Sequence, residues 1–477
     1  MTDPSRGIST NTLEMVTANL SGRLPFGISE PISFNVGYEH RREAAAFDPD
    51  ALQENGVLLT GGGFGFEGIS GSFETDEVYS ELVVPVISDQ QNLPIVKSLS
   101  VEGAVRYVDH SLTDTATTWS GGLRIAPRLP GWGDGLLFRG VFTHAIRSPA
   151  VTELFLGKSP VATGLTDICN QDSYNQGINP AVREANCRAA LAAVGGPAPE
   201  AFDETTDLAS VVGTQSGNPN LENEEADSWS VGIVYQPVEH PQLRFAADWS
   251  NIRLEGGIED LPIGQLMLAC YDSPDFPNVP ACGQFHRLTA AEAAAQQGPA
   301  RIAGDVANGF KTGYINTSKI EFEGLIVEAG YSLELPSVAS SLHFGTKLFY
   351  MDEFRTTSFA GVPSDNSAGL IGVPRVRLNF DVGYSWRNID LGLQARWTDK
   401  VIFDRNNTIE DVPFNQVDAY TLLNGSIGYR FSDKVSFLVS IDNLTNKEMP
   451  FEALINRAVA QYDLIGRRYF ATVRANF

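Results

Sequence analysis

The 477-residue chain lacks several features that would place it in a common class of protein. It contains no run of about 18 apolar residues, so the sequence predicts no transmembrane helix. It has no basic excess, because 58 Asp and Glu outnumber 34 Lys and Arg and leave a net charge of -24. This balance argues against a nucleic-acid partner, since phosphate binding needs a basic face. Charged residues make up only 19 % of the chain, below the roughly 25 % usual for soluble domains.

Motifs of catalysis and of metal binding are also missing. The six histidines show no metal-ligand spacing, and no zinc or phosphate-loop motif is present. An enzyme would need a nucleophile or an acid–base pair at its site, and no motif for one appears. The sequence therefore predicts neither an enzyme nor a bound cofactor.

What the chain does have is strict alternation of apolar and polar residues. In the segment Arg375–Trp386, "RVRLNFDVGYSW", every second side chain belongs to an apolar face. That face carries Val376, Leu378, Phe380, Val382, Tyr384 and Trp386. After Arg387 and Asn388 the alternation resumes in "IDLGLQARW", so the two segments predict a β-hairpin with a two-residue turn.

The same pattern predicts about fifteen strands along the chain. They start near residues 12, 31, 72, 94, 116, 136, 226, 242, 313, 341, 374, 388, 418, 434 and 467. Short and long connections alternate between them, with one short link at 109–115 where a long one is expected. Short turns at one end and long loops at the other are typical of an outer-membrane barrel. The predicted fold is therefore all-β: a transmembrane antiparallel up-and-down β-barrel with long extracellular loops.

The two faces of such strands are expected to meet different solvents. Lipid offers no hydrogen bonds, so only helices or a closed sheet can span it. The apolar face then meets lipid and the polar face meets a wet lumen. An aromatic girdle is expected at the headgroup level, from Trp229, Trp249, Tyr384, Trp386, Trp397 and Tyr429. The alternative is a large soluble antiparallel sheet with one face on a core, against which the number of strands and the sorted loops both argue.

The odd number of strands bears on topology. If the short turns are periplasmic, residue 1 begins outside and Phe477 ends in the periplasm, whereas bacterial single-chain barrels have an even number of strands. An odd number of strands is then expected to precede Met1, where no signal segment appears. Each open edge would leave roughly ten backbone groups unpaired in hydrocarbon, at several kcal/mol apiece. The sheet is therefore expected to close on itself or to be completed by further strands.

Four segments, taken in their order and spacing, resemble the TonB-dependent outer-membrane receptors. They are "RGVFTHAIRSPAVTELF" (Arg139–Phe155), "GNPNLENEEADSWSVGI" (Gly217–Ile233), "IDNLTNKE" (Ile441–Glu448) and "YDLIGRRYFATVRANF" (Tyr462–Phe477). The second segment departs from the family pattern, with Asn223 in place of a proline. The resemblance covers nearly the whole chain.

The resemblance implies a barrel of about 22 strands with an N-terminal plug, in which residues 1–477 are a partial barrel domain. It implies the outer membrane of a Gram-negative bacterium, contact with the bilayer and lipopolysaccharide, a small-molecule ligand, and a TonB complex acting through the N-terminal region. It also implies that the last strand is a signal for the barrel-assembly machinery; the alternative is a final strand that simply ends in Phe. The face expected to carry the signal is Tyr469, Ala471, Val473, Ala475 and Phe477.

Two long loops contain all four cysteines. Cys169 and Cys187 lie in the loop 148–225, and Cys270 and Cys282 lie in the loop 255–312. Two disulfides are expected, each stabilising its loop by about 3 kcal/mol in the chain-entropy model, and four free thiols are the alternative. The segments "NPAVREANCRAALAAV" and "LTAAEAAAQQ" predict short helices in these loops. The first loop is acidic, which suits either capture of a cationic or metal-complexed ligand or an ordinary solvated surface.

Five arginines are expected to face the lumen, where they contact an anionic ligand or the plug, or act as ordinary lumen charges. They are Arg139, Arg147, Arg375, Arg377 and Arg396. The predicted function is TonB-dependent uptake of a scarce nutrient: siderophore-iron, cobalamin or an oligosaccharide. A passive porin-like channel, a barrel enzyme built from side chains distant in sequence, and a non-functional truncated gene product remain as alternatives.

Overall fold

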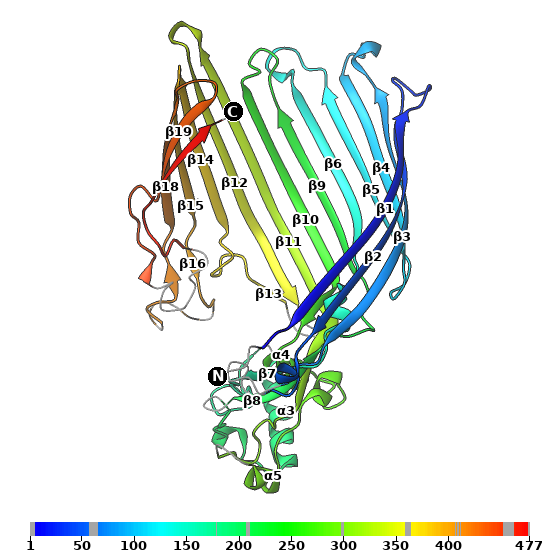
Figure 1. Cartoon of the computed structure of the whole chain (residues 1–477), viewed down its shortest axis with the longest axis vertical. Helices are drawn as coiled ribbons and strands as arrows, with labels where there is room; N and C mark the ends of the chain where they lie inside the picture. The colour runs from blue at the N-terminus through cyan, green and yellow to red at the C-terminus, as the bar shows by residue number, and fades with distance from the viewer. Residues whose placement is uncertain are drawn as a thin grey trace.

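The computed structural model describes residues 5–475 apart from 57–64, 178, 207–209, 297–299, 358–363, 406, 408–409, 411 and 452–461. Fifteen strands of eight residues or more form one curved antiparallel wall (Figure 1). The wall strands are β1 (Ile8–Arg23), β2 (Ser33–Asp48), β3 (Ile69–Ile87), β4 (Val96–His110), β5 (Ala116–Pro127), β6 (Leu136–Arg147), β9 (Glu224–Tyr235), β10 (Leu243–Asp260), β11 (Phe310–Leu335), β12 (Ser340–Thr357), β14 (Val376–Trp386), β15 (Ile389–Thr398), β18 (Tyr420–Arg430), β19 (Val435–Asp442) and β20 (Arg468–Ala475). The predicted number of strands is confirmed.

Each wall strand pairs with the next one along the wall, and the connections are sorted by length. Short turns lie at the upper end in Figure 1 and long loops at the lower end, as the sequence predicted. Minor strands and short helices interrupt the long loops and turns. Outside residues 148–223 and 261–309, these are α1 (Ala51–Glu54), η2 (Asp89–Gln91), η3 (Gly131–Gly133), η6 (Pro336–Val338), β13 (Asp365–Asn366), β16 (Val401–Ile402) and β17 (Gln416–Val417).

The hairpin β14–β15 shows how local sequence sets the register. Trp386 pairs with Ile389, so only Arg387 and Asn388 form the turn, as predicted. Arg387 has φ +54°, the left-handed conformation that such a two-residue turn requires. Because side chains alternate along each strand, this register places the apolar residues of both strands on one face.

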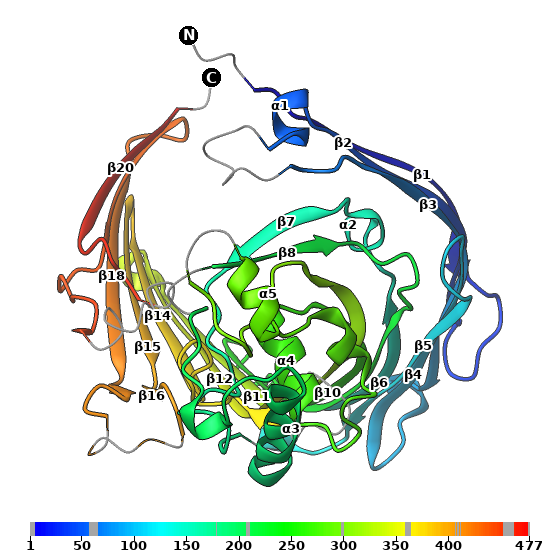
Figure 2. The same cartoon turned by 90° about the horizontal axis from the view of Figure 1, so that it is seen from below.

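Within the described residues, the wall has two free edges. β1 pairs only with β2, and β20 pairs only with β19. Figure 2 shows the two edges next to the N- and C-termini, on either side of a gap in the ring. Fifteen alternating strands give β1 and β20 the same direction, so a direct contact between them would be a parallel pair.

A short helix identifies the concave face of the wall. α2 (Val151–Phe155) lies inside the ring in Figure 2 and packs against β3. A Cβ atom on Gly71 would lie only 2.2 Å from the Phe155 ring, and Phe73 shares a buried cluster with Val151 and Leu154. The face of β3 that carries Gly71 and Phe73 also carries Glu77, so the polar face lines the interior, as expected.

The opposite, convex face is apolar and open. Its exposed side chains include Val78, Val105, Trp119, Leu123, Phe138, Phe142, Val231, Phe380, Leu393 and Ile427. Of the expected girdle, Tyr384, Trp386 and Tyr429 lie near the short turns, and Trp229 and Trp397 lie toward the long loops, whereas Trp249 pairs with Val231 near the middle of the wall. Trp249 donates a hydrogen bond of 2.8 Å to Glu323 on the same face. Polar edges on aromatic rings suit a membrane interface.

Two long loops fold together into one structured unit. Residues 148–223 and 261–309, here called the loop body, lie across the lower end of the wall in Figures 1 and 2. The loop body contains α2 together with β7 (Ser159–Thr163), α3 (Pro180–Ala193), η4 (Pro199–Ala201), β8 (Val211–Ser216), α4 (Ile263–Tyr271), η5 (Pro280–Gln284) and α5 (Ala290–Ala295). Both predicted helices are present, as α3 and α5. Among the described helices, none is long and apolar enough to cross a membrane.

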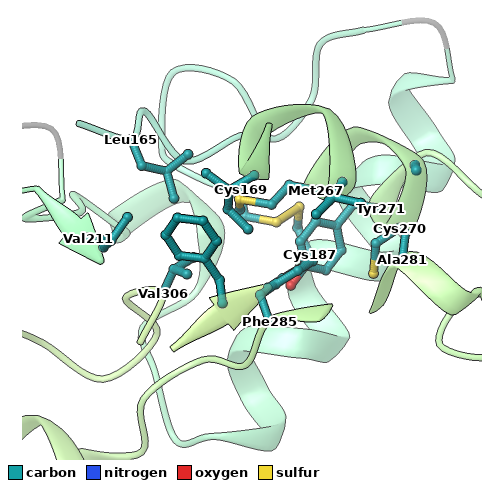
Figure 3. Close-up of a cluster of buried hydrophobic side chains, with 14 of the residues drawn as sticks. Leu165, Cys169, Cys187, Val211, Met267, Cys270, Tyr271, Ala281, Phe285 and Val306 are labelled. Atoms are coloured by element: carbon teal, nitrogen blue, oxygen red, sulfur yellow. A yellow bond between two sulfur atoms is a disulfide. The ribbon is translucent and has the colours of Figure 1, made fainter. Parts of the chain in front are cut away.

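The loop body contains a buried hydrophobic core (Figure 3). Both expected disulfides are present, Cys169–Cys187 and Cys270–Cys282, and all four cysteines are buried in this core or pack against it. Met267, Leu191 and Phe202 are completely buried beside them. The described residues contain no free cysteine, so the free-thiol alternative is excluded for this structure.

The final strand β20 keeps the expected alternation. Tyr469 pairs with Ile441, and Val473 pairs with Phe437, so Tyr469, Ala471, Val473 and Ala475 share the convex apolar face. Phe477 lies outside the described residues.

Candidate functional site: the polar wall and the loop body

Ion pairs between neighbouring strands cover much of the polar face. Arg106 donates to Glu77 at 2.7 Å. Farther along the wall, Lys347 contacts Glu328 at 2.6 Å. Lys347 and Glu328 both stay exposed, so that pair contributes little to stability, whereas in the first pair Glu77 is buried and Arg106 is partly exposed.

Two of the five predicted lumen arginines belong to this pattern. Arg139 on β6 makes two parallel hydrogen bonds to Asp248 on β10, at 2.7 and 2.6 Å. Arg147, at the loop end of β6, holds both Glu224 and Glu153, at 2.5 and 3.0 Å. A guanidinium already paired with carboxylates is poorly available to an anionic ligand. Arg139 and Arg147 are therefore better explained as positioning residues of the wall.

Arg147 is the centre of a junction between the wall and the loop body. Glu224, at the loop end of β9 and beyond the membrane-spanning part of that strand, also accepts a hydrogen bond of 2.7 Å from Ile258 N. Burial alone would raise the pKa of the Glu224 carboxyl, but the hydrogen bonds from Arg147 and Ile258 outweigh it and leave that pKa below its usual value. Glu153 caps α2 by accepting from Ala150 N at 2.7 Å.

The same junction explains the structural role of the Gly-Asn-Pro segment that begins at Gly217. Gly217 N donates to Leu156 O at 2.8 Å, and Asn218 N donates to Glu153 O at 2.9 Å. Asn218 also donates through its side chain to Tyr314 O at 3.1 Å. These bonds attach the segment after β8 to α2, so both family motifs act in positioning the loop body. Asn223, which stands where the family has a proline, bonds with Thr113 at 3.2 Å.

The "IDNLTNKE" segment forms a second polar junction, near the loop end of β18, β19 and β20. The buried Asn443 side chain donates to Lys447 O at 2.9 Å and to Asp463 at 3.1 Å. Its carbonyl oxygen accepts from Lys447 N at 2.7 Å, and its backbone N–H donates to Asn424 at 3.0 Å. Because every polar group of Asn443 is engaged, this motif is explained by structure rather than by ligand contact.

The other three predicted arginines differ from the first two. Arg377 and Arg396 are exposed, and within the described residues neither forms an ion pair. Arg377 donates to Gly372 O at 3.3 Å, and Arg375, just before β14, donates to Asp352 O at 3.1 Å. In the pairing of β14 with β15, Arg396 lies opposite Asn379, and Asn379 is two residues after Arg377 on β14. Arg375 before β14, Arg377 on β14 and Arg396 on β15 thus have no carboxylate bonded to their guanidinium groups within the part of the chain that the structure describes.

Aromatic rings lie beside these arginines on the polar face. Phe349 of β12 pairs with Arg377, and its ring stacks on Phe322 of β11 with centroids 6.1 Å apart. Apolar rings on a lumen wall are available for contact with a ligand or a plug, and arginine groups combine with them for recognition of planar anions. We call Arg375, Arg377, Arg396, Phe322 and Phe349 the arginine–aromatic patch.

The loop body is held by two buried ion pairs. Arg287 donates to Asp167 at 2.7 and 2.9 Å and to the Tyr271 hydroxyl at 2.7 Å. Arg183 donates to Asp272 with two bonds of 2.6 Å. Burial disfavours the charged guanidinium, but Asp167 and Tyr271 outweigh this effect and leave the pKa of Arg287 above its usual value. These pairs lock the loop body, because removing one partner would leave a bare buried charge.

Sequence reasoning missed Asp248, Glu224 and Asp167 as partners of arginines. The alternation on β10 places Asp248 on the polar face, so that signal was present. Asp167 and Arg287 are 120 residues apart, and no local pattern connects them. No group of His, Cys, Asp and Glu suited to a metal ion occurs in the described part of the chain.

The beta-barrel model of the TonB dependent receptor-like family matches residues 3–444. The chain belongs to this family. No curated protein sequence matches it. Among solved structures, a mutant of the ferric enterobactin receptor PfeA from Pseudomonas aeruginosa is similar, with a TM-score of 0.56 at 16 % identity, over 98 % of this chain and 54 % of that chain.

Two further receptors show the same fold. The siderophore receptor PirA from Acinetobacter baumannii gives a TM-score of 0.55 at 16 % identity, over 98 % of this chain and 55 % of its own. A double mutant of the hemophore receptor HasR from Serratia marcescens, in complex with its hemophore HasA and heme, gives a TM-score of 0.53 at 14 % identity. The match covers 99 % of this chain and 60 % of the HasR chain. Such low identities establish the fold alone. The chain spans between half and two thirds of the length of these receptors.

Proposed function

We propose that this chain forms part of the wall and mouth of an outer-membrane receptor for TonB-dependent uptake of a scarce nutrient. The family match and the receptor fold support this role, as do the polar concave face and the loop body across one end. On this proposal the chain is a transporter component and not an enzyme, in the outer membrane of a Gram-negative bacterium. It meets the bilayer, lipopolysaccharide and the barrel-assembly machinery, which recognises β20. The two free edges of the wall support the proposal that residues 1–477 form a partial barrel domain within a larger closed wall.

The observation that carries the proposal is the arginine–aromatic patch. Among the described residues, Arg377 on β14 and Arg396 on β15 face the interior without a carboxylate partner, whereas Arg139 and Arg147 on β6 are paired. Unpaired guanidinium groups beside stacked rings suit a planar anion. Of the three nutrient classes, this chemistry favours an anionic metal chelate such as siderophore-iron over a neutral oligosaccharide. Contact with a plug domain would use the same groups when no ligand is bound.

A growth experiment tests the proposal. A strain that lacks the gene is expected to grow poorly when iron is supplied only as one ferric siderophore, and the wild-type gene is expected to restore growth. The double variant Arg377→Gln, Arg396→Gln is expected to take up the labelled chelate at least tenfold more slowly, since each lost charge-assisted hydrogen bond weakens binding by about 1.5–3 kcal/mol.

Arg430→Gln is the matched control, because Arg430 also lies on the polar face but contacts Asp390 at 3.4 Å near the short turns. Uptake by this control is expected to match the wild type. Uptake that continues after the proton-motive force is removed would instead support a passive pore. Normal growth of the deletion strain on ferric siderophores, cobalamin and oligosaccharides alike would contradict the receptor proposal.

A further inference from the structure

A cavity of about 400 Å³ lies where the loop body joins the wall. Its sides come from the start of β11, from α4 and η5 of the second long loop, and from Ser216–Asn218 of the first, so neither loop forms it alone. Leu261, Leu266 and Ala281 form an apolar floor, and all three are buried at the edge of the loop-body core. A cavity of this size with an apolar floor and a few polar groups is the usual form of a small-molecule site.

The amide and charged side chains around the cavity fall into two kinds. Asn218 and Asn316 are already committed, since they donate to Tyr314 O and Gly256 O at 3.1 and 2.8 Å. Lys311 and Gln284 also line the cavity, and within the described residues their side chains make no hydrogen bond or ion pair. Lys311 is the one charged residue of the lining, in which no carboxylate occurs. As far as the described residues show, the cavity therefore presents the unpaired ammonium of Lys311 and the unpaired amide of Gln284 above an apolar floor.

We propose that this cavity binds a small amphipathic carboxylate. The apolar body of the ligand lies on Leu261, Leu266 and Ala281, and its carboxylate accepts from Lys311 and Gln284. The site goes beyond the import proposal and does not depend on it, because it is separate from the arginine–aromatic patch and uses no residue of it.

The Cys270–Cys282 disulfide fixes two sides of the cavity. Cys270 is on α4 with Leu266, and Cys282 is on η5 next to Ala281. The bridge therefore holds the apolar floor in place, and its loss would let η5 move away from α4. Binding at this site is expected to require the oxidised protein.

Ligand-observed NMR titration of the detergent-solubilised chain tests the site, with benzoate as the anionic probe and benzyl alcohol as its neutral counterpart. Micelles alone provide the reference for partitioning. Lys311→Gln is expected to weaken benzoate binding about tenfold, the effect of one charge-assisted hydrogen bond, and to leave benzyl alcohol unchanged. Lys319→Gln is the matched control, because Lys319 is on the same strand but is paired with Glu321 at 2.7 Å.

Ala281→Phe fills the floor and is expected to abolish binding of both probes. The two disulfides, checked by peptide mapping without reductant, show whether that variant is folded; if it is not, the Lys311→Gln titration decides alone. The proposed site would be overturned if the wild type does not bind benzoate, or if the wild type and Lys311→Gln bind it with equal affinity. Intact benzoate binding in a protein that fails the uptake test would overturn only the receptor proposal.

Discussion

The wall and the loop body use the same amino acids in opposite ways. On the wall, apolar side chains face outward, and Val231 in β9 is 53 % exposed. In the loop body, apolar side chains face inward, and Met267 and Leu191 are completely buried. The loop body follows the rule for a protein in water, whereas the wall follows the rule for a sheet with lipid on one side.

Charges divide in the same way. Several ion pairs on the wall are half exposed and connect neighbouring strands, as Lys347 and Glu328 do. The loop body instead buries Arg287 and Asp167 completely. An exposed pair contributes little, but a buried pair strongly penalises the loss of one partner. The comparison teaches that stability of the loop body depends on single residues, while that of the wall depends on the repeated strand pattern.

The largest expected effect follows from breaking a buried pair. Arg287→Met leaves Asp167 unpaired in the core, and we expect the loop body to lose about 3–5 kcal/mol of stability. Hydrogen exchange of the loop-body amides measures this loss. Arg188→Met is the matched control, since Arg188 pairs with Glu200 on the surface and should cost less than about 1 kcal/mol. Equal effects of the two substitutions would contradict the comparison.

Loss of a disulfide should act on the loop body alone. Replacing Cys169 and Cys187 together with Ser removes a bridge across 18 residues and is expected to cost about 3 kcal/mol. Limited proteolysis should then cut within 148–223 while the wall strands stay protected. Cleavage of the wall at the same rate would show that the two regions unfold together.

A charge on the convex face should be costly only if lipid covers that face. Val231→Arg near the middle of β9 is expected to cost about 2 kcal/mol or more in a bilayer. Ser230→Arg, one residue earlier on the polar face, is expected to cost close to nothing. Equilibrium unfolding in lipid vesicles, compared for the two variants, measures the difference. Two equal costs would favour a sheet in water.

Acid should loosen the junction between the two regions. The pKa of Glu224 lies below its ordinary value of 4.5, so this carboxylate stabilises the junction above that value and the contribution is lost as the pH falls through the lowered pKa. The protection of the Ile258 amide, measured as its exchange rate relative to the intrinsic rate at each pH, is expected to fall as the pH drops through the lowered pKa of Glu224. Glu224→Gln should remove this pH dependence. An unchanged dependence in that variant would place the titrating group elsewhere.

Much of the wall could be predicted from the sequence because its signal is local. Apolar and polar residues alternate within each strand, so the strands, their order and the hairpin at Arg387 followed directly. The disulfide pairs followed from loop membership, since each long loop contains two cysteines. The two helices in the loops were also visible locally.

The architecture of the loop body could not be predicted, because long-range contacts create it. β8 pairs in parallel with the start of β11, and Phe310 lies opposite Gly213 almost a hundred residues away. Nor could the sequence show which of the five lumen arginines are paired with carboxylates and which are not. Arg139 and Arg377 occupy equivalent alternating positions, and the first is distinguished by Asp248, which lies two strands away on β10 and reaches it across Gly232 of β9.

The central claim is that the wall has lipid on its convex face and water on its concave face. Spin labels at single added cysteines, Val231→Cys and Ser230→Cys, test it in vesicles, because the native cysteines are all bridged. The label at position 231 is expected to collide more with oxygen, which dissolves in lipid, and the label at 230 more with a water-soluble nickel chelate. Equal access of both labels to the nickel chelate would contradict a membrane-spanning wall.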